Sequence, residues 1–307
     1  MKKFGFIFPG QGSQEIAMGK DFYDNFPISR EIFENANDIL RYSLTDVIFN
    51  SSKESLDLTQ NSQLAIFVNS VSILKVLENL FPKIYPTICA GLSLGEYTAL
   101  YASKKISFED AVLLIKKRAT LMDEACKLNK GTMAAVLGME KEDIILAIKE
   151  IPDVWIANLN TPKQIVVSGK KESVEQAEIV LKEKGAKRVI VLDVQGAFHS
   201  PFMKYAEENL KNEILKARIV SSDVDIVMNV SASVEHDPEI IKTNLIKQIT
   251  SSVRWYESIR EMDHKIDFFI EMGNGKTLSG MNKKIEVKAN SISIEKVKDL
   301  KEIEKCF

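Results

Sequence analysis

The chain has 307 residues, of which 45% are hydrophobic, a length that suits one large globular unit or two coupled ones. Its 41 basic and 43 acidic residues leave a formal net charge of -2, so the composition offers no electrostatic footprint for nucleic acid or a membrane surface. Cys89, Cys126 and Cys306 are odd in number and lack C-x-x-C spacing, which argues against a disulfide framework or a zinc site and favours a reducing cytoplasm.

The chain opens with an apolar run at residues 4–8, which predicts a strand, followed by P-G-Q-G-S-Q at residues 9–14. The apolar run is too short for the core of a signal peptide. A strand followed by G-x-G suggests dinucleotide binding, but the third glycine of G-x-G-x-x-G would fall at Glu15, and an acid there would oppose a pyrophosphate. Such a loop can instead bring backbone amides and the Gln11 side chain close to a reacting oxygen. A loop without function is the alternative.

Residues 21–47 and 63–80 have helical spacing. In the second segment, apolar residues recur at three- and four-residue intervals, as on a helix that faces a core. Residues 58–74 carry no charge, yet their many Thr, Gln, Asn and Ser side chains make a bilayer span implausible. We therefore expect a soluble intracellular protein.

An apolar run at residues 86–90 predicts a strand that leads into G-L-S-L-G at residues 91–95, and a helix-competent run follows. This is the nucleophile-elbow pattern G-x-S-x-G in the strand-to-helix context that it requires. The two glycines permit a turn in which larger side chains would collide, leaving the Ser93 hydroxyl at a helix N-terminus, where developing negative charge is favoured. Ser93 is therefore the candidate nucleophile. A chance match of a short Gly/Ser pattern is the alternative.

Residues 108–126 predict a further helix, which carries Lys116, Lys117 and Arg118 in a row. Charge runs of this kind usually mark a solvated helix face. Periodicity alone therefore places Arg118 in solvent.

Residues 128–195 change character. Strands are predicted at 133–139, 154–160, 164–169 and 187–194, with helices at 141–151 and 171–185. The order β-α-β-β-α-β is the signature of a ferredoxin-like unit. Such a unit inserted behind an α/β core would leave a cleft at the junction, which is a usual place for a ligand site.

The last of these strands leads into Q-G-A-F-H-S-P at residues 195–201. The chain has three histidines, of which His236 lies in a polar turn and His264 lies between two charged residues. His199 alone follows a buried strand, so elimination makes it the candidate general base for Ser93. A purely structural histidine is the alternative.

Beyond His199, strands are predicted at 225–230 and 266–272, and helices at 240–250 and 253–264. The sequence G-N-G-K-T at residues 273–277 is similar to the end of a phosphate-binding P-loop. The earlier glycine that a P-loop requires would fall at Ile270, so we exclude that function.

Along nearly its whole length the chain resembles the malonyl-coenzyme A:acyl-carrier-protein transacylase family of bacterial fatty acid synthesis. The matching stretches are F-P-G-Q-G-S-Q at 8–14, G-L-S-L-G-E-Y at 91–97, K-K-R-A-T-L-M at 116–122, A-N-L-N-T-P-K-Q-I-V-V-S-G at 157–169, A-F-H-S at 197–200, Q-I-T-S-S-V-R-W at 248–255 and G-N-G-K-T-L-S-G at 273–280. The resemblance implies an α/β-hydrolase-like core at residues 1–127 and 196–307, with an inserted ferredoxin-like βαββαβ subdomain at 128–195.

The resemblance also implies a role for individual residues. Ser93 would attack the malonyl thioester while His199 takes its proton. The backbone carbonyl of Gln248, rather than a carboxylate, would orient His199. Backbone amides at Gln11 and Leu94 would hold the oxyanion.

In the family an arginine binds the malonyl carboxylate, and the matching residue here is Arg118. A planar guanidinium supplies the two parallel charge-assisted hydrogen bonds that such a contact requires. This implication overrides the solvated position that periodicity alone assigns to Arg118. Two residues depart from the family pattern: Leu92 replaces a histidine common before the nucleophile, and Asn274 replaces the proline of Gly-Pro-Gly, which leaves that turn less rigid.

The implied reaction acylates Ser93 from malonyl-coenzyme A and then passes the malonyl group to the pantetheine thiol of acyl carrier protein. It needs no cofactor or metal. We expect a cytoplasmic monomer whose partners are malonyl-coenzyme A and acyl carrier protein, with no nucleic acid and no membrane. Three alternatives stay open: a discrete acyltransferase of a polyketide synthase, a serine esterase or thioesterase, and a non-catalytic module that binds carrier protein.

Overall fold

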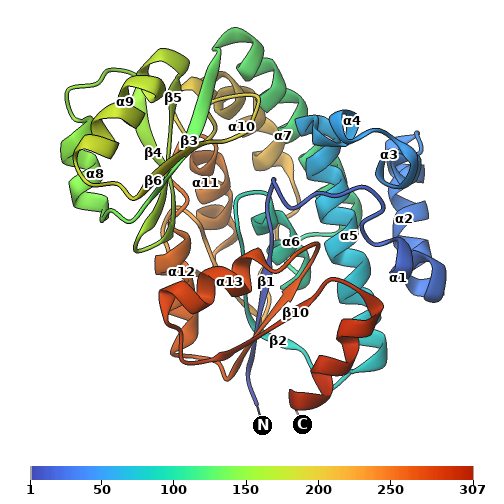
Figure 1. The fold of residues 1–307 in the computed structure, drawn as a ribbon. Coiled ribbons are helices and arrows are strands. Elements are labelled where there is room, and N and C mark those ends of the chain that lie inside the picture. The colour runs from blue at the N-terminus through green and yellow to red at the C-terminus, as the bar shows by residue number, and fades with distance from the viewer. Residues whose placement is uncertain (1, 307) are drawn as a thin grey trace.

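The computed structural model describes residues 2–306 and contains two separate sheets (Figure 1). The larger sheet has the strand order β10-β9-β1-β2-β7-β8 and is parallel except for the pair β7 and β8. Its strands are β1 (Phe4–Phe8), β2 (Pro86–Gly91), β7 (Asp225–Val227), β8 (Val234–Glu235), β9 (Phe268–Met272) and β10 (Asn290–Ile294). The α/β fold class expected from the sequence is confirmed.

Both faces of this sheet are buried, as is usual for parallel strands. In β1, Phe6 and Phe8 point into one apolar cluster, whereas Ile7 points into another on the opposite face. Figure 1 shows α5 (Thr59–Leu80) and α6 (Gly95–Ala102) on one side of the sheet and α12 (Trp255–Asp263) and α13 (Thr277–Ile285) on the other. The continuous apolar run at residues 4–8 reflects this double burial.

The second sheet is antiparallel and has the order β4-β5-β3-β6. Its elements, in chain order, are β3 (Gly131–Leu137), α8 (Lys141–Ile148), β4 (Val154–Thr161), β5 (Gln164–Lys170), α9 (Lys171–Glu183) and β6 (Arg188–Val191). This is the predicted β-α-β-β-α-β succession, with the strand order of a ferredoxin-like sheet. An apolar cluster of its own fills the space between this sheet and its two helices. The last strand is shorter than the predicted 187–194.

The remaining helices surround the larger sheet. They are α1 (Lys20–Asn25), α2 (Pro27–Leu40), α3 (Leu44–Asn50), α4 (Lys53–Asp57), α7 (Phe108–Leu128), α10 (Lys204–Lys216) and α11 (Pro238–Gln248), with 3-10 turns at Pro201–Met203 and Val297–Cys306. The continuous helical spacing expected at residues 21–47 is wrong in detail. Pro27 is the first residue of a new helix, α2. Arg41 caps the C-terminal end of α2 in a left-handed conformation with φ 61°.

Helix α5 is long and apolar enough to cross a bilayer by length and composition, but 78% of its apolar window is buried inside the molecule. It packs against α2, α6 and α7. Its polar residues, among them Gln63 and Asn69, are buried as well. In this structure α5 is therefore a core helix.

The loops that follow β1 and β2 meet at one edge of the larger sheet, because the two strands are parallel neighbours. The smaller sheet is attached next to this edge. Hydrogen bonds from Val253 N to Ala157 O and from Leu159 N to Val253 O join the segment between α11 and α12 to strand β4. The junction between the two sheets therefore lies beside the loops that follow β1 and β2 and beside strand β4.

Candidate active site

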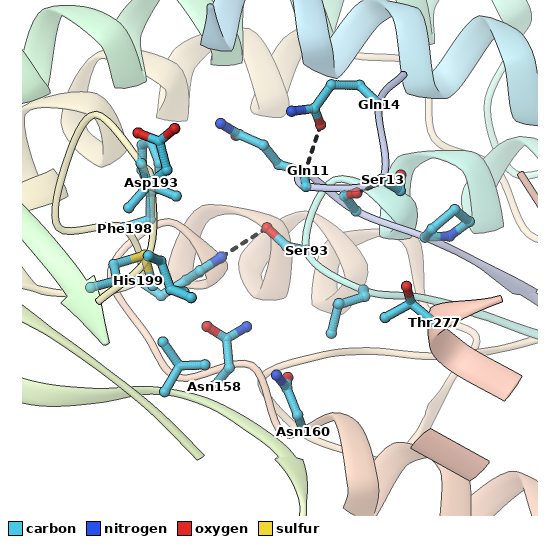
Figure 2. Close-up of a pocket in the computed structure, with 18 of the residues that line it drawn as sticks. Gln11, Ser13, Gln14, Ser93, Asn158, Asn160, Asp193, Phe198, His199 and Thr277 are labelled. Carbon is cyan, nitrogen blue, oxygen red and sulfur yellow. Dashed lines mark hydrogen bonds between the residues drawn. The ribbon is translucent and has the colours of Figure 1, made fainter. Parts of the chain in front are cut away.

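A cavity of about 580 Å³ opens at this junction (Figure 2). The loop after β1 and the turn after β2 form one wall, and residues from β4, β5 and the segment that follows β6 form the other. Its lining includes Gln11, Ser93, Asn158, Asn160, Phe198 and His199. Figure 2 shows the His199 side chain directed at the Ser93 hydroxyl, whereas the Gln11 side chain extends away from it.

The turn that carries Ser93 is a nucleophile elbow. Ser93 has a φ of 54°, an uncommon left-handed conformation for a residue with a side chain. A Cβ atom on Gly91 would lie 1.9 Å from the carbonyl oxygen of Gly95, and a Cβ on Gly95 would lie 2.2 Å from the carbonyl oxygen of Phe8. Only glycine fits at both positions.

Asn229, in the segment after β7, holds this turn from behind. Its side-chain Oδ1 accepts a hydrogen bond from Ser93 N at 2.7 Å, and its Nδ2 donates to Gly91 O at 2.7 Å. Both bonds go to the backbone of the elbow. Asn229 thus helps to maintain the left-handed conformation of Ser93.

His199 lies within hydrogen-bond distance of Ser93: its Nε2 is 2.8 Å from Ser93 Oγ, and its Nδ1 is 2.8 Å from the backbone carbonyl oxygen of Gln248. A carbonyl only accepts, so Nδ1 carries the proton and Nε2 is free to accept from the serine. Burial, with the nearby charge of Arg118, lowers the pKa of His199 to about 4. The imidazole is therefore neutral at pH 7. The other two histidines, His236 and His264, are exposed.

Arg118 is only 1% exposed, so the solvated position assigned from periodicity is wrong. Lys116 and Lys117 beside it do face solvent. The guanidinium donates from Nη1 to Gln63 Oε1 at 2.6 Å and from Nη2 to Gln248 Oε1 at 3.0 Å and Ser93 Oγ at 3.2 Å. It is not among the residues that line the cavity and lies behind Ser93.

The remaining predicted site residues are Gln11 and Leu94. Gln11 lines the cavity, and Leu94 is buried directly after Ser93. Within residues 2–306, neither backbone amide donates a hydrogen bond to the protein. Neither amide is therefore committed to another acceptor within this range.

Sequence reasoning missed three residues of this network: Gln63, Glu96 and Asn229. Glu96 at the start of α6 and Asn229 after β7 had a weak signal, because each is a polar or charged side chain next to apolar residues. Gln63 in α5 had none, because it ends the polar stretch of residues 59–63. Such a side chain needs partners when it is buried. The sequence alone does not show that those partners are one another.

Leu92 and Asn274, the two residues that depart from the family pattern, also lie at this edge of the larger sheet. Leu92 lines the cavity as an apolar residue. Asn274 donates from Nδ2 to Ser13 O at 2.9 Å, which ties the turn after β9 to the glycine-rich loop after β1. This hydrogen bond restrains a turn that the absence of proline would otherwise leave freer.

Among the described residues, no group of three or more His, Cys, Asp or Glu side chains could hold a metal ion. The arrangement instead pairs a hydroxyl with a neutral imidazole, leaves the backbone amides of Gln11 and Leu94 without an acceptor in the described part of the chain, and buries a cation next to the hydroxyl. A hydroxyl, a base and free amides are the groups that acyl transfer through a serine uses.

Residues 5–287 match the acyl transferase domain family. The chain is 42% identical over 303 residues to the malonyl CoA-acyl carrier protein transacylase of Bacillus subtilis (strain 168), covering 96% of this chain and 94% of that protein. It is 38% identical over 306 residues to the protein of the same name from Staphylococcus aureus (strain MRSA252), covering 98% of both.

Solved structures are also similar to this chain along nearly its whole length. The crystal structure of MCAT from Streptococcus pneumoniae is 39% identical, with a TM-score of 0.93 over 99% of this chain and 100% of that one. A malonyl-transacylase solved in complex with its type II polyketide acyl carrier protein is 32% identical, with a TM-score of 0.95 over 99% of this chain and 100% of that one.

Proposed function

Because this chain belongs to the acyl transferase domain family, we propose that it moves a malonyl group from malonyl-coenzyme A to an acyl carrier protein, through an acyl-enzyme on Ser93. The observation that carries this proposal is the contact of 2.8 Å between Ser93 Oγ and His199 Nε2 at a glycine-bounded elbow. The full-length relatives, which are named for this same reaction, support the choice of substrates.

In the first half-reaction, His199 Nε2 removes the proton from Ser93 Oγ as the oxygen attacks the thioester carbonyl. The oxyanion that forms is stabilised by the backbone amides of Gln11 and Leu94. When it collapses, the carbon–sulfur bond breaks, and His199 returns its proton to the departing sulfur. Coenzyme A leaves as the thiol, and Ser93 carries the malonyl ester.

In the second half-reaction, the pantetheine thiol of the carrier protein gives its proton to His199 and attacks the ester. The thioester forms as the bond to Ser93 Oγ breaks, and the serine recovers its proton from His199. The thiol must react before water does, which requires a sheltered ester. The position of Ser93 inside the cavity supports this requirement.

Arg118 would bind the malonyl carboxylate. In the unacylated protein, Arg118 Nη2 donates to Ser93 Oγ at 3.2 Å, so the guanidinium already lies beside the atom that becomes acylated. Two charge-assisted hydrogen bonds to a carboxylate are worth more than one to a hydroxyl. Malonylation would therefore replace a weak partner of Arg118 by a strong one.

We further propose the division of the chain into a core of residues 1–127 and 196–307 and a subdomain of residues 128–195. The subdomain supplies the cavity wall that faces Ser93. We also propose that the protein is a cytoplasmic monomer and that its reaction needs no cofactor.

A polyketide carrier protein is a second candidate acceptor. The similarity to a malonyl-transacylase bound to a type II polyketide acyl carrier protein favours this possibility. The chemistry at Ser93 would be the same with either carrier. Competing fatty-acid-synthase and polyketide carrier proteins for the malonyl-enzyme would separate the two.

The test is intact-mass spectrometry of the protein after malonyl-coenzyme A, and again after holo acyl carrier protein. We expect the gain of one malonyl group, followed by its appearance on the carrier. Ser93→Ala should gain nothing. Labelling of the alanine variant would contradict the assignment of Ser93, and loss of the label to water at the same rate without carrier would indicate a thioesterase.

A further inference from the structure

The positive charge of Arg118 is held in the protein by neutral groups. Its hydrogen-bond acceptors are the amide oxygens of Gln63 and Gln248 and the hydroxyl of Ser93, and no ion pair to it occurs within residues 2–306. A buried cation without a counter-ion favours an anionic ligand. The site can select a carboxylated acyl group only while the acceptors around Arg118 stay neutral and in place.

The orientation of the Gln248 amide is decisive for this arrangement. Its Oε1 faces Arg118, while its Nε2 donates to Glu96 Oε2 at 2.6 Å and to Ser93 O at 2.9 Å. Rotating the amide by a half-turn would direct its N–H groups at the guanidinium, which has only donors. The groups that accept from Nε2 therefore determine whether Arg118 is held.

Glu96 makes the shorter of these two contacts, and it is completely buried. Its second oxygen, Oε1, accepts from the backbone N–H of Asn229 at 2.5 Å. The carboxyl group, protonated or ionised, thus offers one oxygen to each neighbour, whereas a glutamine side chain has a single oxygen. The reaction proposed for Ser93 and His199 makes no use of Glu96.

We propose that Glu96 is a positioning residue for the acyl-carboxylate site: it fixes the Gln248 amide so that Oε1 faces Arg118, and the preference for a carboxylated acyl group depends on it. The inference rests on the proposed malonyl transfer. It adds a specificity determinant that touches neither the substrate nor the arginine.

Glu96→Gln is the sharpest test, because the variant keeps the shape of the side chain. The new side-chain amide would keep its oxygen on Asn229 N and turn its N–H groups toward Gln248. The Gln248 amide would then rotate to accept from these N–H groups, and Arg118 would lose that acceptor. We expect the ratio of malonyl to acetyl acylation rates, measured by single-turnover intact mass with each thioester, to fall about tenfold, the effect of one lost charge-assisted hydrogen bond.

A double-mutant cycle separates this role from a merely structural one. Because Glu96 acts through Arg118, Glu96→Gln should leave the malonyl-to-acetyl ratio almost unchanged in an Arg118→Ala background. If Glu96 only supported the elbow through Asn229, both thioesters would react more slowly by the same factor in either background. That result would overturn the inference.

Glu271 offers a matched control. It is also a buried carboxyl that accepts from two backbone amides, those of Leu278 and Ser279. Glu271→Gln should reduce stability without changing the malonyl-to-acetyl ratio. If wild type formed no malonyl-enzyme, the proposed function would fail together with the inference; a labelled wild type with an unchanged ratio in Glu96→Gln would overturn the inference alone.

Should Glu96→Gln fold poorly, the exchanged pair Glu96→Gln with Gln248→Glu keeps a hydrogen bond between positions 96 and 248 and one from Arg118 to position 248, and loses the one that Gln248 Nε2 donates to Ser93 O. In that protein, the amide at position 96 donates to the carboxylate at position 248, which also accepts from Arg118 and neutralises it. We expect the malonyl preference to fall at least as far as in the single variant. An exchanged pair with the wild-type ratio would show that a neutral acceptor beside Arg118 is not needed, which contradicts the inference.

Discussion

The protonation state of His199 determines whether Ser93 can be activated. Burial lowers the pKa of His199 to about 4, so the neutral, proton-accepting form is present above that pH and is lost as the pH falls through it. We expect single-turnover acylation from malonyl-coenzyme A to persist well below pH 6.5 and to fall near pH 4. The rate constant should be measured by rapid quench and mass spectrometry across this range. A midpoint close to 6.5 would contradict a buried, neutral base.

The three histidines allow a direct comparison of base and bystander. His199→Ala should slow acylation about 10²–10⁴-fold, the usual contribution of general-base assistance. His236→Ala and His264→Ala should leave the rate nearly unchanged, because both side chains are exposed. Acylation rates of the three variants measured side by side would test this; damage at either exposed histidine comparable to that at His199 would refute the assignment.

Arg118 is expected to determine the choice of acyl group. Truncating one partner of a buried charge pair costs about 2–5 kcal/mol, which corresponds to about 30-fold to several-thousand-fold in rate. Arg118→Ala should therefore lose malonyl transfer, whereas acetyl transfer holds or rises, since an acetyl group has no carboxylate to bind. Competition of the two thioesters for each enzyme, read by mass, yields the ratio. An unchanged ratio would remove Arg118 from substrate selection.

At the scale of elements, the elbow requires β1, β2 and α6 to approach closely. A methyl group on Gly95 would lie 2.2 Å from Phe8 O, so α6 could not keep its place beside β1. Gly95→Ala should lower the free energy of unfolding by about 1–3 kcal/mol or more and slow acylation, because Ser93 shifts relative to His199. Chemical denaturation and acylation rates measure the two effects.

Gly280 in α13 is the matched control for Gly95. Nothing lies within 4 Å of a Cβ placed on it. Gly280→Ala should be neutral or slightly stabilising, since alanine favours a helix by about 1 kcal/mol over glycine. Equal destabilisation by the two substitutions would show that close packing at the elbow is not the reason for Gly95.

For the whole molecule, Glu96 makes stability depend on pH. Burial raises its pKa to about 8, against the hydrogen bond from Asn229, the charge of Arg118 and the hydrogen bond from Gln248. The folded protein therefore binds a proton that the unfolded chain has released above about pH 4.5, and this contribution is lost as the pH rises through 8. Above pH 6.5, His199 is mostly neutral in both the folded and the unfolded state, so it adds little to this dependence.

Thermal unfolding between pH 6.5 and pH 8 tests this linkage. The melting temperature of wild type should fall as the pH rises, and the slope should be smaller in Glu96→Gln, which cannot titrate. Parallel slopes in the two proteins would show that Glu96 does not change its protonation on folding.

The sequence by itself determined the elements with strong local signals. The apolar run of β1, the glycine-bounded turn at Ser93 and the alternation of strands and helices in residues 131–191 all appear in the structure close to where they were predicted. Each depends on near neighbours in the chain, such as glycines that admit a tight turn or a periodicity that matches one element. Helix α10 and strand β10 were not predicted.

Only the tertiary structure decided which polar side chains meet. Gln63, Glu96, Arg118 and Gln248 come from four different helices, and their hydrogen bonds join positions as far apart as 152 residues. Local periodicity placed Arg118 in solvent with Lys116 and Lys117. The spacing of charged residues along a helix is the same whether their side chains contact water or buried acceptors. The acceptors of Arg118 lie on other segments of the chain, so its burial depends on how those segments pack.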